Sequence, residues 1–173
     1  MKIQNLVASV DLKTKIPLNE ILANLEEAEY EPEQFPGLVY RLQEPRVSSL
    51  IFQSGKIISL GNKSKADAKK AIDKIIQKLR KIGVPVPRKY QMKIVNIVVT
   101  DDLGRELDLG ELAFQLEESE YEPEQFPGLV YRIFDPKVSF LLFSSGRIVC
   151  AGAKTMGEVR TAIEKLKKRL RKI

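Results

Sequence analysis

The side chains of this chain best suited to chemistry are a few glutamates and one thiol. The letters EYEPE occur at residues 29–33 and again at 120–124, and Cys150 is the single cysteine. There is no histidine, no glycine-rich phosphate loop and no metal-ligand spacing. These absences exclude the common nucleophile–base triads and zinc sites. Nothing around the glutamates indicates the pocket or raised pKa that acid–base catalysis needs, so we expect neither an enzyme nor a cofactor.

A second motif combines an aromatic ring with rigid neighbours. The thirteen letters EYEPEQFPGLVYR occur at 29–41 and 120–132, and they place Phe35 and Phe126 between glutamine and proline. Proline fixes its own φ angle and stiffens the loop that carries each ring. Burial in the core is the alternative, but glutamate, glutamine and proline are poor core neighbours. We therefore expect both rings at the surface.

The duplicated motif belongs to a duplication of nearly the whole chain. At an offset of 91 residues, 42 of 82 positions are identical without a gap. The repeats are residues 1–82 and 92–173, and the linker 83–91, GVPVPRKYQ, is rich in glycine and proline. A period this long indicates a duplicated half and a pseudo-twofold molecule rather than a solenoid.

Composition narrows the class of partner. The chain has 29 basic and 23 acidic residues, a net charge of +6, of which the first repeat carries +4, the second zero and the linker +2. This balance favours a polyanionic partner, although lysine-rich surfaces are often only solvated. Hydrophobic content of 43% without a long apolar stretch predicts a soluble globular protein that does not bind membranes. One cysteine and no signal-peptide pattern predict an intracellular location.

Each repeat reads as the same series of elements. A strand over KIQNLVASV precedes a short helix marked by leucines and isoleucines at helical spacing, and short β-rich runs joined by turns follow. A long helix with one apolar stripe closes the repeat, and in the second repeat Thr155 and Glu158 form a capping-box pattern at its start. The order β-α-β-β-β-β-α, twice, predicts an α+β fold with one antiparallel sheet of about ten strands and four helices on one face.

Strand periodicity separates the two faces of the sheet. If Ile51 and Ile57 point toward the helices, Leu50, Phe52 and Ile58 point away from them. A sheet buried on both faces is the ordinary interpretation of such a pattern. It needs a second covering layer, which four helices do not provide, so an apolar face rimmed by lysine and arginine is expected to bind a partner.

These motifs together resemble the TATA-box-binding protein family in its compact archaeal type. The resemblance covers essentially all 173 residues: NxV at Asn5 and Asn96, EPEQFPG at 31 and 122, the EP and DP turns at 44 and 135, LIFxSGK at 50, LLFxSGR at 141, and GxK at Gly61 and Gly152. The resemblance implies a saddle whose concave sheet binds the minor groove of A·T-rich double-stranded DNA and whose helices lie on the convex side.

Carried over by position, the resemblance assigns a role to each part of the concave face. Two aromatic pairs would wedge between base steps, one at each end of the site: Phe35 with Phe52, and Phe126 with Phe143. The minor-groove floor would comprise Asn5, Val7, Ser9, Leu50, Ile58, Leu60, Asn96, Val98, Thr100, Leu141, Val149 and Ala151. Phosphates would be contacted by Arg41, Ser54, Lys56, Arg132, Ser145 and Arg147.

Two positions depart from the family pattern. Leu60 and Ala151 stand where the family usually has threonine or serine, whose hydroxyl reaches the central base pairs. A lost base contact costs on the order of 1–3 kcal/mol. Extra van der Waals contact with the sugars is the alternative outcome.

The resemblance also implies protein partners. The second EPEQF loop would bind the B-type transcription initiation factor through Glu122, Glu124 and Gln125, and RNA polymerase would follow indirectly. The first loop has the same letters, so local sequence does not decide between them. Free of DNA, the chain could instead homodimerise through the concave sheet. RNA binding is disfavoured because sheets that bind RNA present aromatic rings in mid-strand, and this face is aliphatic.

Overall fold

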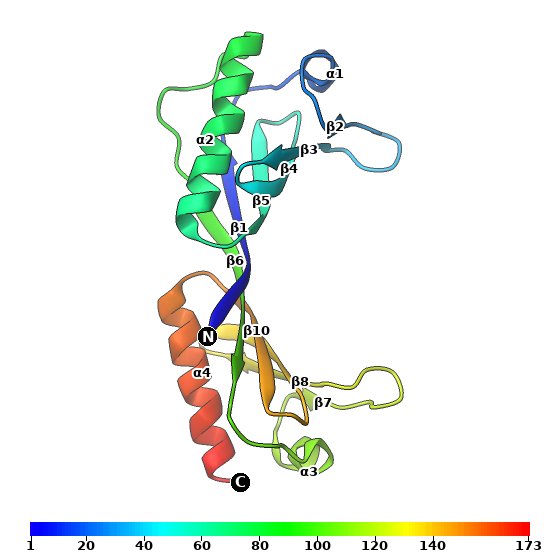
Figure 1. The fold of residues 1–173 in the computed structure, drawn as a ribbon, viewed down its shortest axis with the longest axis vertical. Coiled ribbons are helices and arrows are strands. Elements are labelled where there is room, and N and C mark those ends of the chain that lie inside the picture. The colour runs from blue at the N-terminus through cyan, green and yellow to red at the C-terminus, as the bar shows by residue number, and fades with distance from the viewer. The chain divides into compact units, whose positions relative to one another are not determined.

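The computed structural model describes all 173 residues and shows the predicted element order twice (Figure 1). The first repeat contains β1 (Lys2–Asp11), α1 (Leu18–Leu22), β2 (Ala28–Glu29), β3 (Leu38–Gln43), β4 (Arg46–Ile51), β5 (Lys56–Asn62) and α2 (Lys65–Ile82). The second contains β6 (Lys93–Asp102), α3 (Leu109–Gln115), β7 (Ser119–Glu120), β8 (Leu129–Phe134), β9 (Lys137–Leu142), β10 (Arg147–Ala153) and α4 (Met156–Arg171).

The strands pair in the same order in both repeats. Neighbours run β2-β3-β4-β5-β1 in the first and β6-β10-β9-β8-β7 in the second. Each of these ladders is antiparallel. The predicted α+β class, with ten strands and four helices, is confirmed.

Local sequence explains where the long helices begin. Ser64 Oγ accepts the Asp67 backbone N–H at 3.0 Å, and Thr155 Oγ1 accepts the Glu158 N–H at 3.0 Å, so each helix satisfies one of its free amide groups. The predicted helix start at Thr155 is thus confirmed. No helix combines the length and apolar character needed to cross a lipid bilayer.

The core of each repeat lies between its long helix and one face of its strands. Leu6, Ala8 and Val10 of β1 are almost fully buried, and Val7 and Ser9 between them are half-buried. Ile51 of β4 and Ile57 of β5 are also fully buried. Helix α2 packs on β5 and α4 on β10. Alternation along the strands therefore sends one set of side chains to the helix and leaves the other set on what we call the open face.

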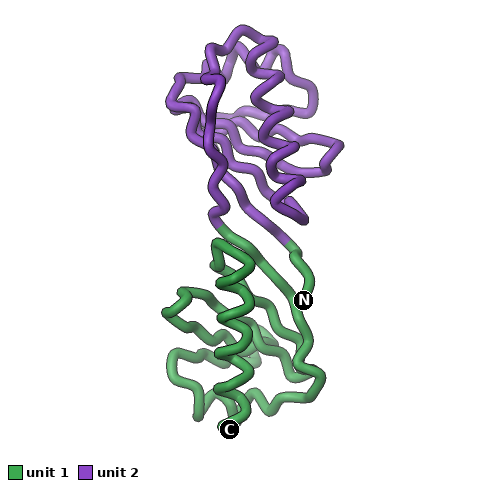
Figure 2. Tube along the Cα trace, turned by 90° about the vertical axis from the view of Figure 1, so that its left-hand side faces the viewer, with its two compact units in different colours: residues 1–4, 96–173 green, residues 5–95 purple.

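The chain forms two compact units that differ from its two sequence repeats (Figure 2). One unit comprises Asn5–Val95, and the other comprises Met1–Gln4 together with Asn96–Ile173. Residues 4 and 95 are equivalent at the repeat offset of 91. The first four residues of each repeat therefore belong to the unit that is formed mainly by the other repeat.

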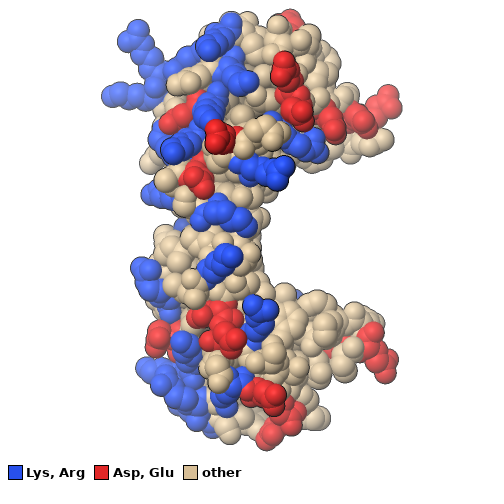
Figure 3. Space-filling view, viewed as in Figure 1, with Lys and Arg blue, Asp and Glu red and all other residues tan.

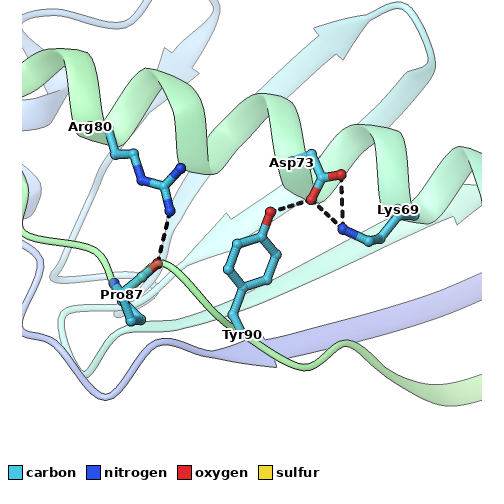
Figure 4. A network of polar contacts seen from close by, with 5 residues as sticks. All are labelled: Lys69, Asp73, Arg80, Pro87 and Tyr90. Atoms are coloured by element: carbon cyan, nitrogen blue, oxygen red, sulfur yellow. Dashed lines mark hydrogen bonds and ion pairs between the residues drawn. The ribbon is translucent and has the colours of Figure 1, made fainter.

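The linker is held against α2 by side chains of its own unit (Figure 4). The Tyr90 hydroxyl donates to Asp73, Lys69 Nζ lies 2.7 Å from Asp73 Oδ1, and the same ammonium lies 5.1 Å from the centre of the Tyr90 ring. Further along, Arg80 donates to the carbonyl of Pro87 at 2.9 Å. These contacts fix the path of the chain into β6.

Candidate nucleic-acid interface

The apolar residues predicted for the floor lie in rows across the open face of each unit. In one unit Leu50 pairs with Ile58, and Ile58 with Ser9. In the other, Leu141 pairs with Val149, and Val149 with Thr100. Every one of these six side chains is half-buried. The structure therefore brings them together in two equivalent rows.

The sequence reasoning missed one residue at the end of each row. Val39 pairs with Leu50, and Val130 pairs with Leu141, and both valines are half-buried. Their neighbours Leu38 and Leu129 are fully buried. The alternation in the LVYR stretch would have identified them.

A second row places hydroxyl groups next to the two unusual floor positions. Ser48 pairs with Leu60, and Ser139 pairs with Ala151. Both serines are half-buried on the open face, and neither was singled out from the sequence. Each unit therefore carries a hydroxyl one strand away from the position where the family pattern has its own.

The two asparagines occupy equivalent places on the first strand of each repeat. Asn5 and Asn96 are half-buried, and Val7 and Val98 follow them on the same face. The backbone N–H of Gly61 donates to Asn5 Oδ1 at 2.8 Å, and that of Gly152 donates to Asn96 Oδ1 at 2.8 Å. Each asparagine side chain is therefore oriented by the protein itself.

The four phenylalanines form the two expected pairs. The ring centres of Phe35 and Phe52 lie 5.9 Å apart with 64° between the planes, and those of Phe126 and Phe143 lie 6.0 Å apart at 65°. Such edge-to-face contact adds about 0.5–1.5 kcal/mol beyond burial. Each loop ring stays 41% exposed, so an apolar edge faces solvent.

A buried glycine beneath each pair leaves no room for a side chain. A Cβ atom at Gly37 would lie 2.7 Å from Phe35 Cε2 and 3.0 Å from Phe52 Cε1, and Gly128 meets Phe126 at the same 2.7 Å. The glycine of QFPG therefore allows the two rings to approach each other. Its role was not recognised from the sequence.

The six residues predicted to contact phosphates surround the open face, and two of them form ion pairs within the protein. Arg41 Nη1 lies 3.3 Å from Glu29 Oε1, and Arg132 Nη1 lies 3.3 Å from Glu120 Oε1, each pair bridging neighbouring strands. The other four predicted residues are exposed and have no ion pair: Ser54, Lys56, Ser145 and Arg147.

A hollow of about 830 Å³ lies beside one aromatic pair, within the unit that contains β10. Its lining includes Phe143, Ser145, Arg147, Val149 and Thr100. One wedge ring, two floor residues and two phosphate-contact candidates thus surround a single concavity. Elsewhere, lysine and arginine side chains gather over α2 and α4 (Figure 3).

Acidic side chains mark the tips of the β2–β3 and β7–β8 loops (Figure 3). Glu122, Glu124 and Gln125 are exposed. The N–H groups of Gln125 and Phe126 both donate to the Glu122 carbonyl, at 2.9 and 3.0 Å, and the first loop repeats this turn at Glu31. The two loops therefore agree in backbone geometry as well as in sequence.

The single thiol takes no part in this surface. Cys150 is fully buried in β10, and burial raises the pKa of its thiol to about 11. It is therefore protonated at neutral pH and unsuited to nucleophilic chemistry.

Comparisons with known proteins agree with one another. The sequence profile of the family described as "Transcription factor TFIID (or TATA-binding protein, TBP)" matches residues 1–82 and 91–173. The chain is 51% identical over 173 residues to a TATA-box-binding protein of Picrophilus torridus, covering 99% of this chain and 94% of that protein. It is 47% identical over 170 residues to one of Methanosphaera stadtmanae, covering 98% and 93%. Among solved structures, Methanococcus jannaschii TBP superposes with a TM-score of 0.94 at 48% identity, covering 99% of this chain and 98% of that one. The chain therefore belongs to the TATA-box-binding protein family, a family of transcription factors and not of enzymes.

Proposed function

We propose that this protein is a general transcription initiation factor that binds the minor groove of TATA-like DNA through its open face and kinks it with two phenylalanine pairs. The observation that carries this proposal is the paired geometry of the rings. Phe35 and Phe126 are each 41% exposed, and each is braced by a second ring about 6 Å away.

Exposed rings on stiff loops suit insertion between base steps. TATA-box-binding proteins are themselves the standard example of such minor-groove wedges. The partner ring and the tight glycine limit the directions in which the loop ring can lean, so little order has to be gained on binding. One pair in each repeat supplies two kinks, one toward each end of the bound segment.

The apolar floor favours A·T pairs because it offers no hydrogen-bond acceptor to the amino group of guanine. In the minor groove A·T and T·A present only acceptors, whereas guanine adds a 2-amino donor. Floor residues such as Leu50, Ile58 and Val149 offer that amino group no acceptor and would desolvate it. Asn5 and Asn96 would donate to the acceptors of A·T pairs.

The basic residues around the floor contribute affinity rather than sequence choice. Lys56 and Arg147 are exposed at the starts of equivalent strands. Contacts of this kind to phosphates release counterions, so binding should weaken as salt rises.

A bending assay tests this proposal. A short duplex with a dye at each end is compared with a G·C-substituted duplex across a salt series, using energy transfer between the dyes. Bending should require the A·T site and should be lost in the Phe35→Ala, Phe126→Ala variant. Equal binding of both duplexes without bending would refute the proposal.

We further propose that the β7–β8 loop recruits the B-type initiation factor, and through it RNA polymerase. The two loops match in sequence and turn geometry, so the difference must lie beside them. Phe114 on α3, which leads into β7, is 93% exposed, whereas the equivalent residue of the first repeat is Ala23. A large exposed aromatic next to acidic residues suits a protein interface.

The recruitment proposal is tested by charge reversal in matched loops. Glu122→Arg with Glu124→Arg should abolish the supershift of the protein–DNA complex by the B-type factor, and Phe114→Ala should weaken it. Glu31→Arg with Glu33→Arg, the matched control, should leave the supershift intact. The opposite pattern would assign recruitment to the first loop.

A homodimer in the absence of DNA is the second candidate, because it would cover the same half-exposed apolar rows. If DNA and a second copy compete for the open face, adding a TATA duplex should convert a dimer to a monomer–DNA complex in sedimentation experiments. A dimer that binds DNA without dissociating would place the dimer contact elsewhere.

A further inference from the structure

Two equivalent glycines, Gly61 and Gly152, lie in β-bulges beside the asparagines of the open face. In the first repeat Leu6 pairs with Asn62 and Ala8 with Ser59, so β5 has one residue more than β1 across this step. In the second, Ala151 pairs with Val98 and Ala153 with Ile97, so the extra residue is Gly152. A bulge turns the backbone groups of its extra residue away from the ladder.

Both glycines have backbone angles that other residues adopt with strain. The φ angle is +87° at Gly61 and +106° at Gly152. A Cβ atom at Gly61 would meet nothing within 4 Å, and at Gly152 its nearest neighbour would be the Lys137 carbonyl at 3.4 Å. Space therefore does not require glycine here, and the backbone conformation does.

This conformation directs each glycine N–H at an asparagine side chain. The distance from the Gly61 nitrogen to Asn5 Oδ1 and from the Gly152 nitrogen to Asn96 Oδ1 is 2.8 Å. A backbone N–H can only donate, so the atom that it meets must be the side-chain oxygen. The amide nitrogen then points away from the bulge, and its protons have no hydrogen-bond partner in the protein.

We propose that Gly61 and Gly152 are positioning residues that set which end of each asparagine amide faces the DNA. The inference rests on the proposed function, in which the open face binds the minor groove. With the oxygen held by the bulge, the groove meets two N–H donors, which match the acceptors of A·T pairs. A flipped amide would present its oxygen, which accepts from the 2-amino group of guanine. The bulge thereby converts an ambiguous side chain into a reader of one base-pair type.

The experiment compares glycine variants that share backbone strain but differ in location. Gly61→Ala is matched by Gly83→Ala, because Gly83 also has open space and a φ of +105° but ends α2. Gly152→Ala is matched by Gly104→Ala, with φ of +73° and open space in the turn after β6. Binding is measured for a TATA-like duplex and for the same duplex with central adenines replaced by 2,6-diaminopurine, which adds the minor-groove amino group.

The ratio of the two dissociation constants is the decisive quantity. Gly61→Ala and Gly152→Ala should lower the preference for adenine by on the order of tenfold, from the 1–3 kcal/mol typical of a base contact. The two controls should lose comparable stability and keep the wild-type ratio. Gly61→Asn should restore it, since asparagine tolerates positive φ. An unchanged ratio in folded Gly61→Ala and Gly152→Ala proteins would overturn the inference.

Two further measurements separate the possible failures. If Asn5→Ala with Asn96→Ala binds TATA DNA as tightly as wild type, the proposed role of the asparagines is wrong. If this double variant binds weakly while the glycine variants keep the wild-type ratio of dissociation constants, the positioning role of Gly61 and Gly152 is wrong and the role of the asparagines stands. Should the alanine variants not fold, hydrogen exchange in the wild-type protein decides: the Gly61 and Gly152 N–H groups should be protected, and unprotected groups would refute the proposal.

Discussion

Arg41 reaches across from β3 to Glu29 on β2, with 3.3 Å between Nη1 and Oε1, and Arg132 repeats the contact with Glu120 at the same distance. These arginines are two of the proposed phosphate contacts. Each glutamate occupies one nitrogen of its arginine and places a negative charge beside it, so the acidic residues compete with the phosphates for the arginines.

Replacing both glutamates should therefore strengthen DNA binding. Glu29→Gln with Glu120→Gln should tighten binding several-fold at low salt, measured by fluorescence anisotropy. Conversely, Arg41→Gln with Arg132→Gln should reduce the slope of log K against log salt by about two, near 0.9 for each lost phosphate contact. Glu26→Gln with Glu117→Gln, at exposed positions without an ion pair, controls for net charge. Weaker binding by the Glu29, Glu120 variant would show that the ion pairs hold the arginines ready for DNA.

The glycines beneath the aromatic pairs should control bending rather than overall attraction to DNA. Gly37→Ala with Gly128→Ala forces each Cβ to within 2.7 Å of the loop ring, so the pair must separate. We expect a smaller bend angle in the energy-transfer assay and little change in affinity for non-specific DNA. Gly110→Ala on α3, whose Cβ would meet only Asp108 Oδ1 at an ordinary 3.5 Å, is the control. A normal bend in the double variant would mean that ring pairing is dispensable.

Restoring hydroxyls at the two unusual floor positions should tighten TATA binding. Leu60→Thr with Ala151→Thr puts a hydroxyl where the family pattern has one, and a gained base contact is worth about 1–3 kcal/mol. Leu60→Val with Ala151→Val has nearly the same shape without the hydroxyl. Stronger binding by the threonine variant alone, measured by titration of a TATA duplex, would assign the gain to hydrogen bonding. Equal gains would assign it to shape.

The contact of Tyr90 with Asp73 should appear as a pH-dependent part of folding stability. Burial raises the pKa of the Tyr90 phenol, and the hydrogen bond to Asp73 raises it further. A raised pKa means that the stabilisation is complete below the unfolded value near 10 and is lost as the pH rises past it. Tyr90→Phe should lower the free energy of unfolding by about 1 kcal/mol at pH 7, with the difference shrinking as the pH rises above about 10.

In the acid range the pH dependence of folding stability has the opposite sign, because the pKa of Asp73 is lowered. Burial acts to raise the pKa of Asp73, but hydrogen bonds from Lys69 and Tyr90 outweigh it and lower the pKa below its usual value. That contribution is present above about pH 4 and is lost as the pH falls. Urea unfolding across the pH range measures both limbs. A constant difference between wild type and Tyr90→Phe would refute the link.

Periodicity was enough to assign the faces of most strands. In β1, alternation separates the buried Leu6 and Ala8 from the half-buried Val7 and Ser9, because successive side chains in a strand point to opposite faces. The order of elements also followed from the sequence, since helix and strand periods differ and a capping pattern marked the start of α4.

The bulges were beyond this reasoning, because an extra residue breaks the period of two. Counting by twos from Ile58 and Leu60 would leave Asn62 on the open face. The structure buries it completely, with its amide nitrogen donating to the Leu6 carbonyl at 2.9 Å. The glycine–asparagine contacts were missed for the same reason. Contacts between strands, such as Arg41 with Glu29, depend on register and could not be read from spacing alone.

The exchange of the first four residues between the two units suggests how the duplicated chain arose. Each unit is completed by a short segment that belongs in sequence to the other repeat, and the exchange occurs at equivalent residues, 4 and 95. A reciprocal exchange of this kind is what two identical chains make when they swap their ends in a symmetric dimer. Joined by the nine residues 83–91, such a dimer becomes a single gene product in which the copies can diverge. Phe114 and Asn62, which face Ala23 and Ala153 in the other repeat, are among the positions at which the two copies now differ.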